Sequence, residues 1–120
     1  PVEDTIFGKI TRGEIPTDFL HEDDRCVVIR DLYPQAPTHV LIIPRQPIAM
    51  LSAASENDQA LLGHLLLVAG KIAEQLGVQD AFRLVINNGE GGGQTVFHLH
   101  LHLLAGRDMK EGELAQGLAR

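Results

Sequence analysis

Three of the chain's six histidines occupy alternate positions within five residues: His98, His100 and His102. Alternate residues of a β-strand share one face, so on a strand the three imidazoles point one way and the intervening leucines point into the core. Successive histidine Cβ atoms would lie about 6.5–7 Å apart, close enough to line one ligand together. A face that only meets solvent could have used threonine, lysine or glutamate, so this spacing indicates a chemical site.

Two kinds of chemistry fit this row of histidines, and a non-catalytic polar face is the third interpretation. Two histidines at positions i and i+2 of a strand can bind zinc with a third ligand from elsewhere, but the chain has one cysteine and no His-Glu helix motif to complete the set. A neutral imidazole can instead attack phosphorus, and its neighbours can move protons near neutral pH. The glycine-dense segment 89–94 favours phosphate chemistry, because its N–H groups can form a concave nest for anionic oxygens.

The elements that would position these residues form an α+β domain. Apolar spacing predicts a short helix over 5–12, capped by Asp4 or Thr5, and a long helix that follows a capping-box sequence at Ser55 and ends at Gly77. Strands are predicted over 25–31, 39–43, 82–87 and 97–104, with a short edge strand within 17–22. The last two strands, joined by the glycine loop, favour an antiparallel hairpin. We therefore expect one domain over 1–120, with a mostly antiparallel sheet of five strands covered by the long helix.

The composition narrows the class of partner. A net charge of −6 and the absence of any Lys/Arg run argue against nucleic acid as a ligand, whereas a small phosphate compound remains compatible. Cys26 is the only cysteine, so no internal disulfide is expected, and its apolar neighbours predict a buried, inert thiol. The chain has no signal-peptide pattern and no apolar stretch long enough to span a membrane. We expect a cytoplasmic protein that contacts no membrane.

The segment from His98 to Leu104 has the His-φ-His-φ-His-φ-φ form of the histidine triad (HIT) superfamily, where φ is apolar. Segments 4–10, 31–39 and 92–98 resemble its histidine triad nucleotide-binding (Hint) branch, so the resemblance covers nearly the whole chain. This resemblance implies a HIT-like fold and a purine nucleoside phosphoramidase, a hydrolase that releases AMP from adenosine 5′-phosphoramidates and accepts aminoacyl-adenylates. It also implies a homodimer in which two five-stranded sheets join into one of ten strands.

The resemblance also implies a role for each matching residue. His100 would be the nucleophile that forms a nucleotidyl-imidazole intermediate, His102 would hydrogen-bond the phosphate, and His98 and His39 would form a proton relay behind the nucleophile. Asp31 would accept hydrogen bonds from the ribose. The expected walls of the base pocket are apolar: Ile6, Phe7, Ile10, Ile29, Leu32 and Leu41. The phosphate-contacting set would comprise Asn87, Gly93, Gln94 and Thr95 together with His100 and His102, and neither a cofactor nor a metal is expected.

Several of these residues have an alternative interpretation. Asp31 and Asn87 could be turn residues, His39 a core histidine, and the apolar walls plain core. The chain also departs from many relatives: it has Thr95 in place of serine, Pro47 in place of histidine, and a tail over 107–120 that lacks their Trp-Pro-Pro-Gly ending. A dinucleoside polyphosphate hydrolase, a non-catalytic nucleotide-binding scaffold and a zinc protein remain the competing functions.

Overall fold

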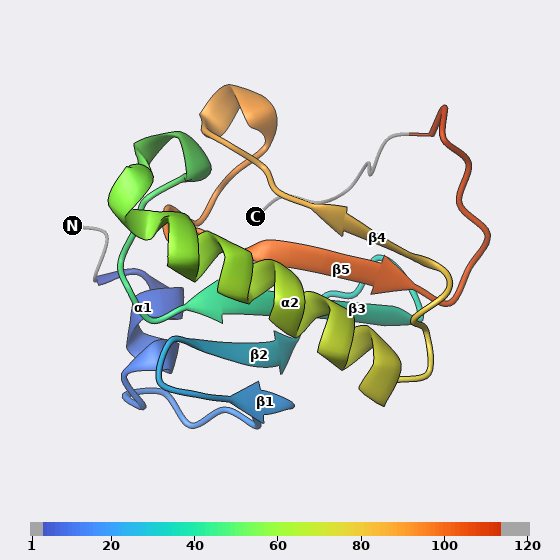
Figure 1. The fold of residues 1–120 in the computed structure, drawn as a ribbon, viewed down its shortest axis with the longest axis horizontal. Helices are drawn as coiled ribbons and strands as arrows, with labels where there is room; N and C mark the ends of the chain where they lie inside the picture. Colours follow the sequence, from blue (N-terminus) through green and yellow to red (C-terminus); the bar gives the residue numbers. More distant parts are fainter. Residues whose placement is uncertain (1–3, 114–120) are drawn as a thin grey trace.

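Five antiparallel strands form one sheet in the order β1-β2-β3-β5-β4 (Figure 1). The computed structural model describes residues 4–113. The strands are β1 (His21–Glu22), β2 (Cys26–Arg30), β3 (Thr38–Pro44), β4 (Phe82–Val85) and β5 (Leu101–Ala105). The predicted α+β class, the edge strand within 17–22 and the antiparallel pairing of the last two strands are confirmed.

Two strand predictions near the histidines extend too far. The strand predicted over 82–87 ends at Val85, and the one predicted over 97–104 begins only at Leu101. The physical reason lies in the hydrogen bonding of the connection between them, because the N–H of Leu99 donates to the carbonyl of Ile48, outside the sheet, at 2.7 Å. His98 and His100 therefore lie in an irregular segment that leads into β5, whereas His102 lies on β5 itself.

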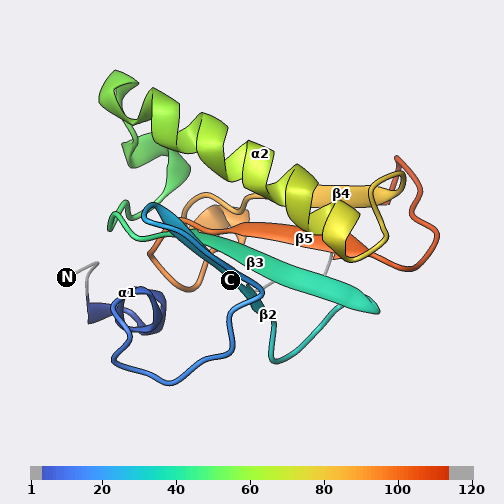
Figure 2. The ribbon, with the colours of Figure 1, turned by 60° about the horizontal axis from the view of Figure 1, so that its bottom comes forward.

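The two faces of the sheet are covered by different helices. Figure 2 shows the long helix α2 (Gln59–Gln75) on one face and the short helix α1 (Ile6–Thr11) on the other. On the α2 side, residues such as Leu65 and Ile72 share a buried core with Leu99, Leu101 and Leu103, as the alternation of leucine and histidine predicted. A second buried cluster on the α1 side comprises Phe7, Ile10, Val27, Ile29, Leu41 and Ile43.

The ends of both helices follow their sequence signals. The Thr5 hydroxyl accepts a hydrogen bond from the Gly8 N–H at 3.1 Å, so Thr5 caps α1. Ser55 and Asp58 form the predicted capping box around a 3-10 turn, Glu56–Asp58, that leads into α2. Gly77, at φ 75°, follows the end of α2 and suits the left-handed conformation that the cap requires. None of the helices within residues 4–113 is long and apolar enough to cross a membrane.

Cys26 belongs to the buried core on the α2 side and has no exposed surface. Burial, with the Asp23 carboxylate nearby, raises the pKa of Cys26 to about 12. The thiol is therefore protonated at neutral pH and cannot act as a nucleophile. The prediction of a buried cysteine is confirmed.

The strand register decides which side chains share the α1 side of the sheet. Leu41 of β3 lies opposite Ile29 of β2 and opposite His102 of β5. The ladder continues one step past β2, where the N–H of Asp31 donates to the carbonyl of His39 at 3.0 Å. Because alternate residues share a face, Asp31, His39 and His102 all lie on the face that α1 covers.

Candidate active site

The three histidines of the triad are buried rather than solvent-facing. His98, His100 and His102 are exposed by 0%, 2% and 1%, respectively. The rings of His100 and His102 lie with centroids 5.1 Å apart, and the ring of Phe7 from α1 lies 4.8 Å from that of His100, edge to face. A solvated polar face would not bury three imidazoles, so this interpretation of the repeat is excluded.

The ring of His100 is oriented by the backbone of its own segment. Its Nδ1 lies 2.7 Å from the carbonyl oxygen of His98. A carbonyl only accepts, so Nδ1 carries the hydrogen and the lone pair of the neutral ring resides on Nε2. Nε2 is therefore the atom of His100 that can attack an electrophile.

A chain of hydrogen bonds fixes the tautomers of His39 and His102. The backbone N–H of Gln35 donates to Nδ1 of His39 at 3.0 Å, so the hydrogen of the His39 ring is on Nε2. That Nε2 lies 2.9 Å from Nδ1 of His102 and 3.4 Å from Oδ2 of Asp31. Since Nδ1 of His102 accepts, the hydrogen of His102 is on Nε2. His102 thus presents an N–H donor from a ring that the His39 ring holds in place.

The structure does not join the rings of His98 and His39 in the predicted proton relay. Nε2 of His98 donates to the carbonyl of Pro44 at 2.7 Å, and its Nδ1 has no hydrogen-bond partner among residues 4–113. Burial lowers the pKa of His98, so its ring stays neutral at neutral pH. The histidine that His39 contacts is His102. His98 instead contributes its carbonyl, which orients His100, and its ring anchors the segment to β3.

The glycine loop is organised differently from the predicted phosphate nest. The N–H groups of Gly92, Gly93 and Gln94 all donate to carbonyls within the loop. The side chain of Gln94, exposed by 2%, accepts from the N–H of Gly89 and donates to the carbonyls of Ala49 and Val96. These three amides and the Gln94 side chain are therefore committed to the loop itself. Gly93 helps to close the loop, because its φ of 96° lies in the left-handed region that glycine adopts without a steric penalty.

The two other predicted phosphate contacts lie in the connection that carries the histidines. Asn87 is half-buried just beyond β4, and Thr95 is exposed just after the glycine turn. Both precede His98 and His100 on residues 86–100, so the chain brings them to the same end of the sheet.

An apolar pocket of about 410 Å³ lies between α1 and the edge of the sheet. Four of the six predicted base-wall residues line it: Ile6, Ile10, Ile29 and Leu32. Ile6 and Leu32 are 48% and 82% exposed, which is typical of a binding wall rather than of core. Phe7 and Leu41 do not line the pocket and belong to the buried cluster on the α1 side. Asp31 sits in sequence between two lining residues, Arg30 and Leu32.

Some functional contacts were not predicted from the sequence. The N–H of Gln35 and the carbonyl of Pro44 fix the tautomers of two histidines, and Ile15 and Leu20 complete the apolar pocket. The Pro34–Pro37 turn indicated a rigid backbone beside His39, but a backbone donor or acceptor leaves no mark in the residue type. Ile15 and Leu20 are apolar residues that come just before β1, and this position could have indicated that they line a pocket.

Comparisons with known proteins agree with this geometry. The HIT domain family matches residues 12–109. The purine nucleoside phosphoramidase of Escherichia coli K12 is 48% identical over 108 residues, covering 89% of this chain and 91% of that protein. An uncharacterised HIT-like protein of Synechocystis is 62% identical over 105 residues, covering 88% and 92%. The crystal structure of a HIT family hydrolase from Legionella pneumophila superposes with a TM-score of 0.88 at 44% identity, covering 91% and 98%. The predicted superfamily is confirmed: the chain belongs to the HIT domain family.

Proposed function

We propose that this chain hydrolyses the phosphorus–nitrogen bond of adenosine 5′-phosphoramidates, and cleaves aminoacyl-adenylates, to release AMP. The observation that carries the proposal is the arrangement of two neighbouring imidazoles: His100 with its lone pair on Nε2 and His102 with its hydrogen on Nε2. The first can attack phosphorus while the second donates to a phosphoryl oxygen. Similarity to the E. coli phosphoramidase supports the choice of leaving group.

The reaction proceeds in two displacements. In the first, Nε2 of His100 forms a bond to the α-phosphorus as the P–N bond breaks, and the departing amine takes a proton from solvent. In the second, water attacks the same phosphorus, the bond to His100 breaks, and AMP leaves with the water oxygen while the remaining proton returns to solvent. One water molecule is consumed, and Nε2 regains its lone pair. Covalent catalysis of this type divides one difficult displacement into two easier ones.

Recognition of the nucleoside is assigned to the apolar pocket and to Asp31. The pocket lined by Ile6, Ile10, Ile29 and Leu32 would take the purine. Asp31 is 7% exposed, and its Oδ1 accepts from the N–H of Tyr33 at 2.8 Å. This hydrogen bond shows that Asp31 stabilises the turn that follows β2. Its contact with the ribose must therefore be tested separately.

Asp31→Asn is expected to reduce the preference for ribose over 2′-deoxyribose substrates. The neutral amide keeps the shape of the side chain but replaces a charge-assisted acceptor, which costs of the order of 1–3 kcal/mol in kcat/KM for the ribose substrate. Steady-state kinetics on an adenosine phosphoramidate and its 2′-deoxy analogue measure the ratio. If the variant discriminates as well as the wild type does, Asp31 is only a turn residue.

The phosphoramidase is separable from its nearest alternatives by one comparison of substrates. A fluorogenic adenosine phosphoramidate should be turned over much faster than a diadenosine polyphosphate. The reverse preference would identify a dinucleoside polyphosphate hydrolase. Binding of AMP with no turnover of either compound would identify a nucleotide-binding scaffold.

We also propose that the chain forms a C2 homodimer. Of the two edge strands within residues 4–113, β4 has four residues and β1 only two, so β4 offers the longer edge to a second copy. Leu66 and Leu67 of α2 are 54% and 68% exposed, which adds apolar surface to the molecule. Light scattering at micromolar concentration should give twice the mass of the chain, and a monomeric mass would contradict the proposal.

A further inference from the structure

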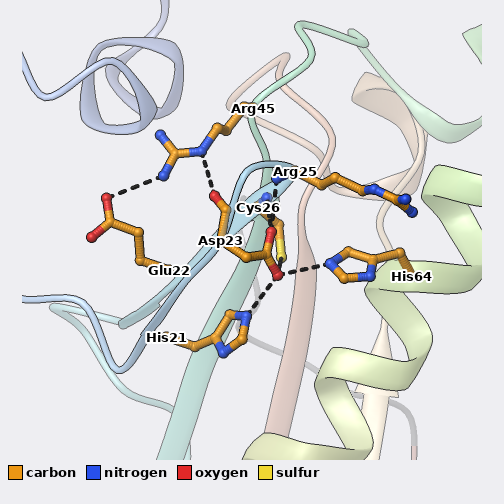
Figure 3. Close-up of polar contacts among 7 residues, drawn as sticks. All are labelled: His21, Glu22, Asp23, Arg25, Cys26, Arg45 and His64. Atoms are coloured by element: carbon orange, nitrogen blue, oxygen red, sulfur yellow. Dashed lines mark hydrogen bonds and ion pairs between the residues drawn. The ribbon is translucent and has the colours of Figure 1, made fainter.

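A second group of polar side chains lies on the α2 side of the sheet, away from the triad. His21 of β1, Asp23 of the following turn, Cys26 at the start of β2 and His64 of α2 converge on one point (Figure 3). Nε2 of His21 and Nε2 of His64 each lie 2.7 Å from the same oxygen, Oδ2 of Asp23. Sγ of Cys26 lies 3.6 Å from that oxygen.

We propose that these four side chains, His21, Asp23, Cys26 and His64, bind one Zn²⁺ ion. Two imidazole nitrogens, one carboxylate oxygen and one sulfur form the kind of four-donor set that tetrahedral zinc accepts. The ligand atoms of His21, Asp23 and Cys26 already lie within 4.8 Å of one another, and His64 adds the fourth from a different element.

The turn around Asp23 is built so that one carboxylate oxygen faces the other donors. Oδ1 accepts from the N–H groups of Arg25 and Cys26 at 2.7 and 2.8 Å, which is sufficient to close the turn. Oδ2 is left to face the two histidines. Two imidazoles directed at one oxygen exceed what the turn itself requires, and they place three potential ligands around a common centre.

The movements required at Asp23 are small, and the largest movement is that of His64. Zinc holds these donors at about 2.0–2.3 Å, so tetrahedral neighbours lie roughly 3.3–3.8 Å apart. Each histidine would therefore retreat from Asp23 by less than about 1 Å, while Cys26 already has that spacing from Asp23. His64 lies outside the group of three whose ligand atoms are within 4.8 Å of one another, so its imidazole would also have to move by more than about 1 Å toward His21 and Cys26. The side chains of His21, Asp23 and His64 are 28%, 23% and 25% exposed, which provides a path for the ion from solvent.

Binding changes the protonation of three groups. The Cys26 thiol gives one proton to solvent and coordinates as thiolate. In His21 and His64, Nε2 must offer its lone pair to the ion, so the ring hydrogen of the bound form is on Nδ1. With Asp23 ionised, the two negative ligands balance the charge of Zn²⁺. The ion would join the β1–β2 hairpin to α2.

The test is a titration of tag-free, metal-free protein with Zn²⁺ and with Co²⁺ as a spectroscopic substitute. We expect one equivalent of each to bind, Co²⁺ with the visible absorption of a tetrahedral ion and a sulfur-to-cobalt charge-transfer band. His64→Gln keeps a helix-compatible polar side chain and should weaken binding by at least about tenfold. Turnover of the phosphoramidate should be unchanged in that variant, because His64 contacts no residue of the triad.

The matched control is His102→Gln, because Asp31, His39 and His102 also place ligand atoms within 4.8 Å of one another. This variant should bind Co²⁺ with the wild-type spectrum. Zinc should also raise the Tm of the wild type but not that of His64→Gln. The proposal is overturned if the wild type shows no stoichiometric binding, or if binding survives in His64→Gln and is lost in His102→Gln.

Discussion

His100→Ala is expected to lower kcat for an adenosine phosphoramidate by more than about 10⁴-fold. General acid–base groups contribute about 10²–10⁴-fold, whereas loss of the nucleophile removes the covalent route itself. The ring of His100 is oriented by the His98 carbonyl so that Nε2 holds the lone pair, and no other imidazole in the described residues is oriented by that carbonyl. Steady-state assays on wild type and variant measure the loss.

Binding of AMP should largely persist in His100→Ala, because the proposed base and ribose contacts lie at α1 and Asp31 rather than at the triad. Calorimetric titration with AMP is therefore the control for folding. A variant that turns over near the wild-type rate would contradict the assignment of the nucleophile. A variant that neither binds AMP nor turns over substrate would have to be replaced by His100→Asn or His100→Gln before the kinetics are interpreted.

His102→Ala is expected to lower kcat/KM by about 10²–10⁴-fold, and His39→Ala by about 10²-fold, because His39 acts through the tautomer of His102. Their effects should not multiply. The activity of the double variant should lie within about tenfold of that of the less active single variant, because groups joined by a hydrogen bond are coupled. Kinetics on the two single variants and the double variant complete the cycle.

The control for this cycle is His39→Gln, whose side-chain amide can still donate toward Nδ1 of His102. It should recover part of the activity that His39→Ala loses, which a purely structural role for His39 would not predict. Fully multiplicative losses in His39→Ala and His102→Ala would show that the two residues act independently, and the proposed chain of hydrogen bonds would have no catalytic part.

The parts of the site that depend on side-chain periodicity could be predicted from the sequence. The leucines between the histidines pack under α2 as their alternation required, and His102 pairs in register beside Leu41. Caps at Thr5 and Ser55 fixed the starts of the helical segments, because short polar side chains bind free N–H groups there. The position of His39 near the triad was predicted from the family resemblance, and the structure shows that His39 contacts His102.

The parts that depend on the backbone could not be predicted. Glycine content suggested free amides for phosphate, but Gln94 and the loop carbonyls use them internally, and residue types do not reveal which amides are already bonded. For the same reason the tautomers of His39 and His98 could not be inferred, since they depend on the Gln35 N–H and the Pro44 carbonyl. The early end of β4 follows from the same segment, because Val85 pairs with His102 and the residues before Leu101 have left the sheet.

The proposed mechanism depends on a covalent nucleotidyl intermediate on Nε2 of His100. Rapid quench of the wild type during turnover of a labelled adenosine phosphoramidate, followed by peptide mapping, tests it most directly. We expect an acid-labile, base-stable adenylyl adduct on the peptide that contains residues 98–102, located at His100 and absent from His100→Ala. An adduct on another residue, or pre-steady-state turnover with no adduct, would show that His100 is not the nucleophile.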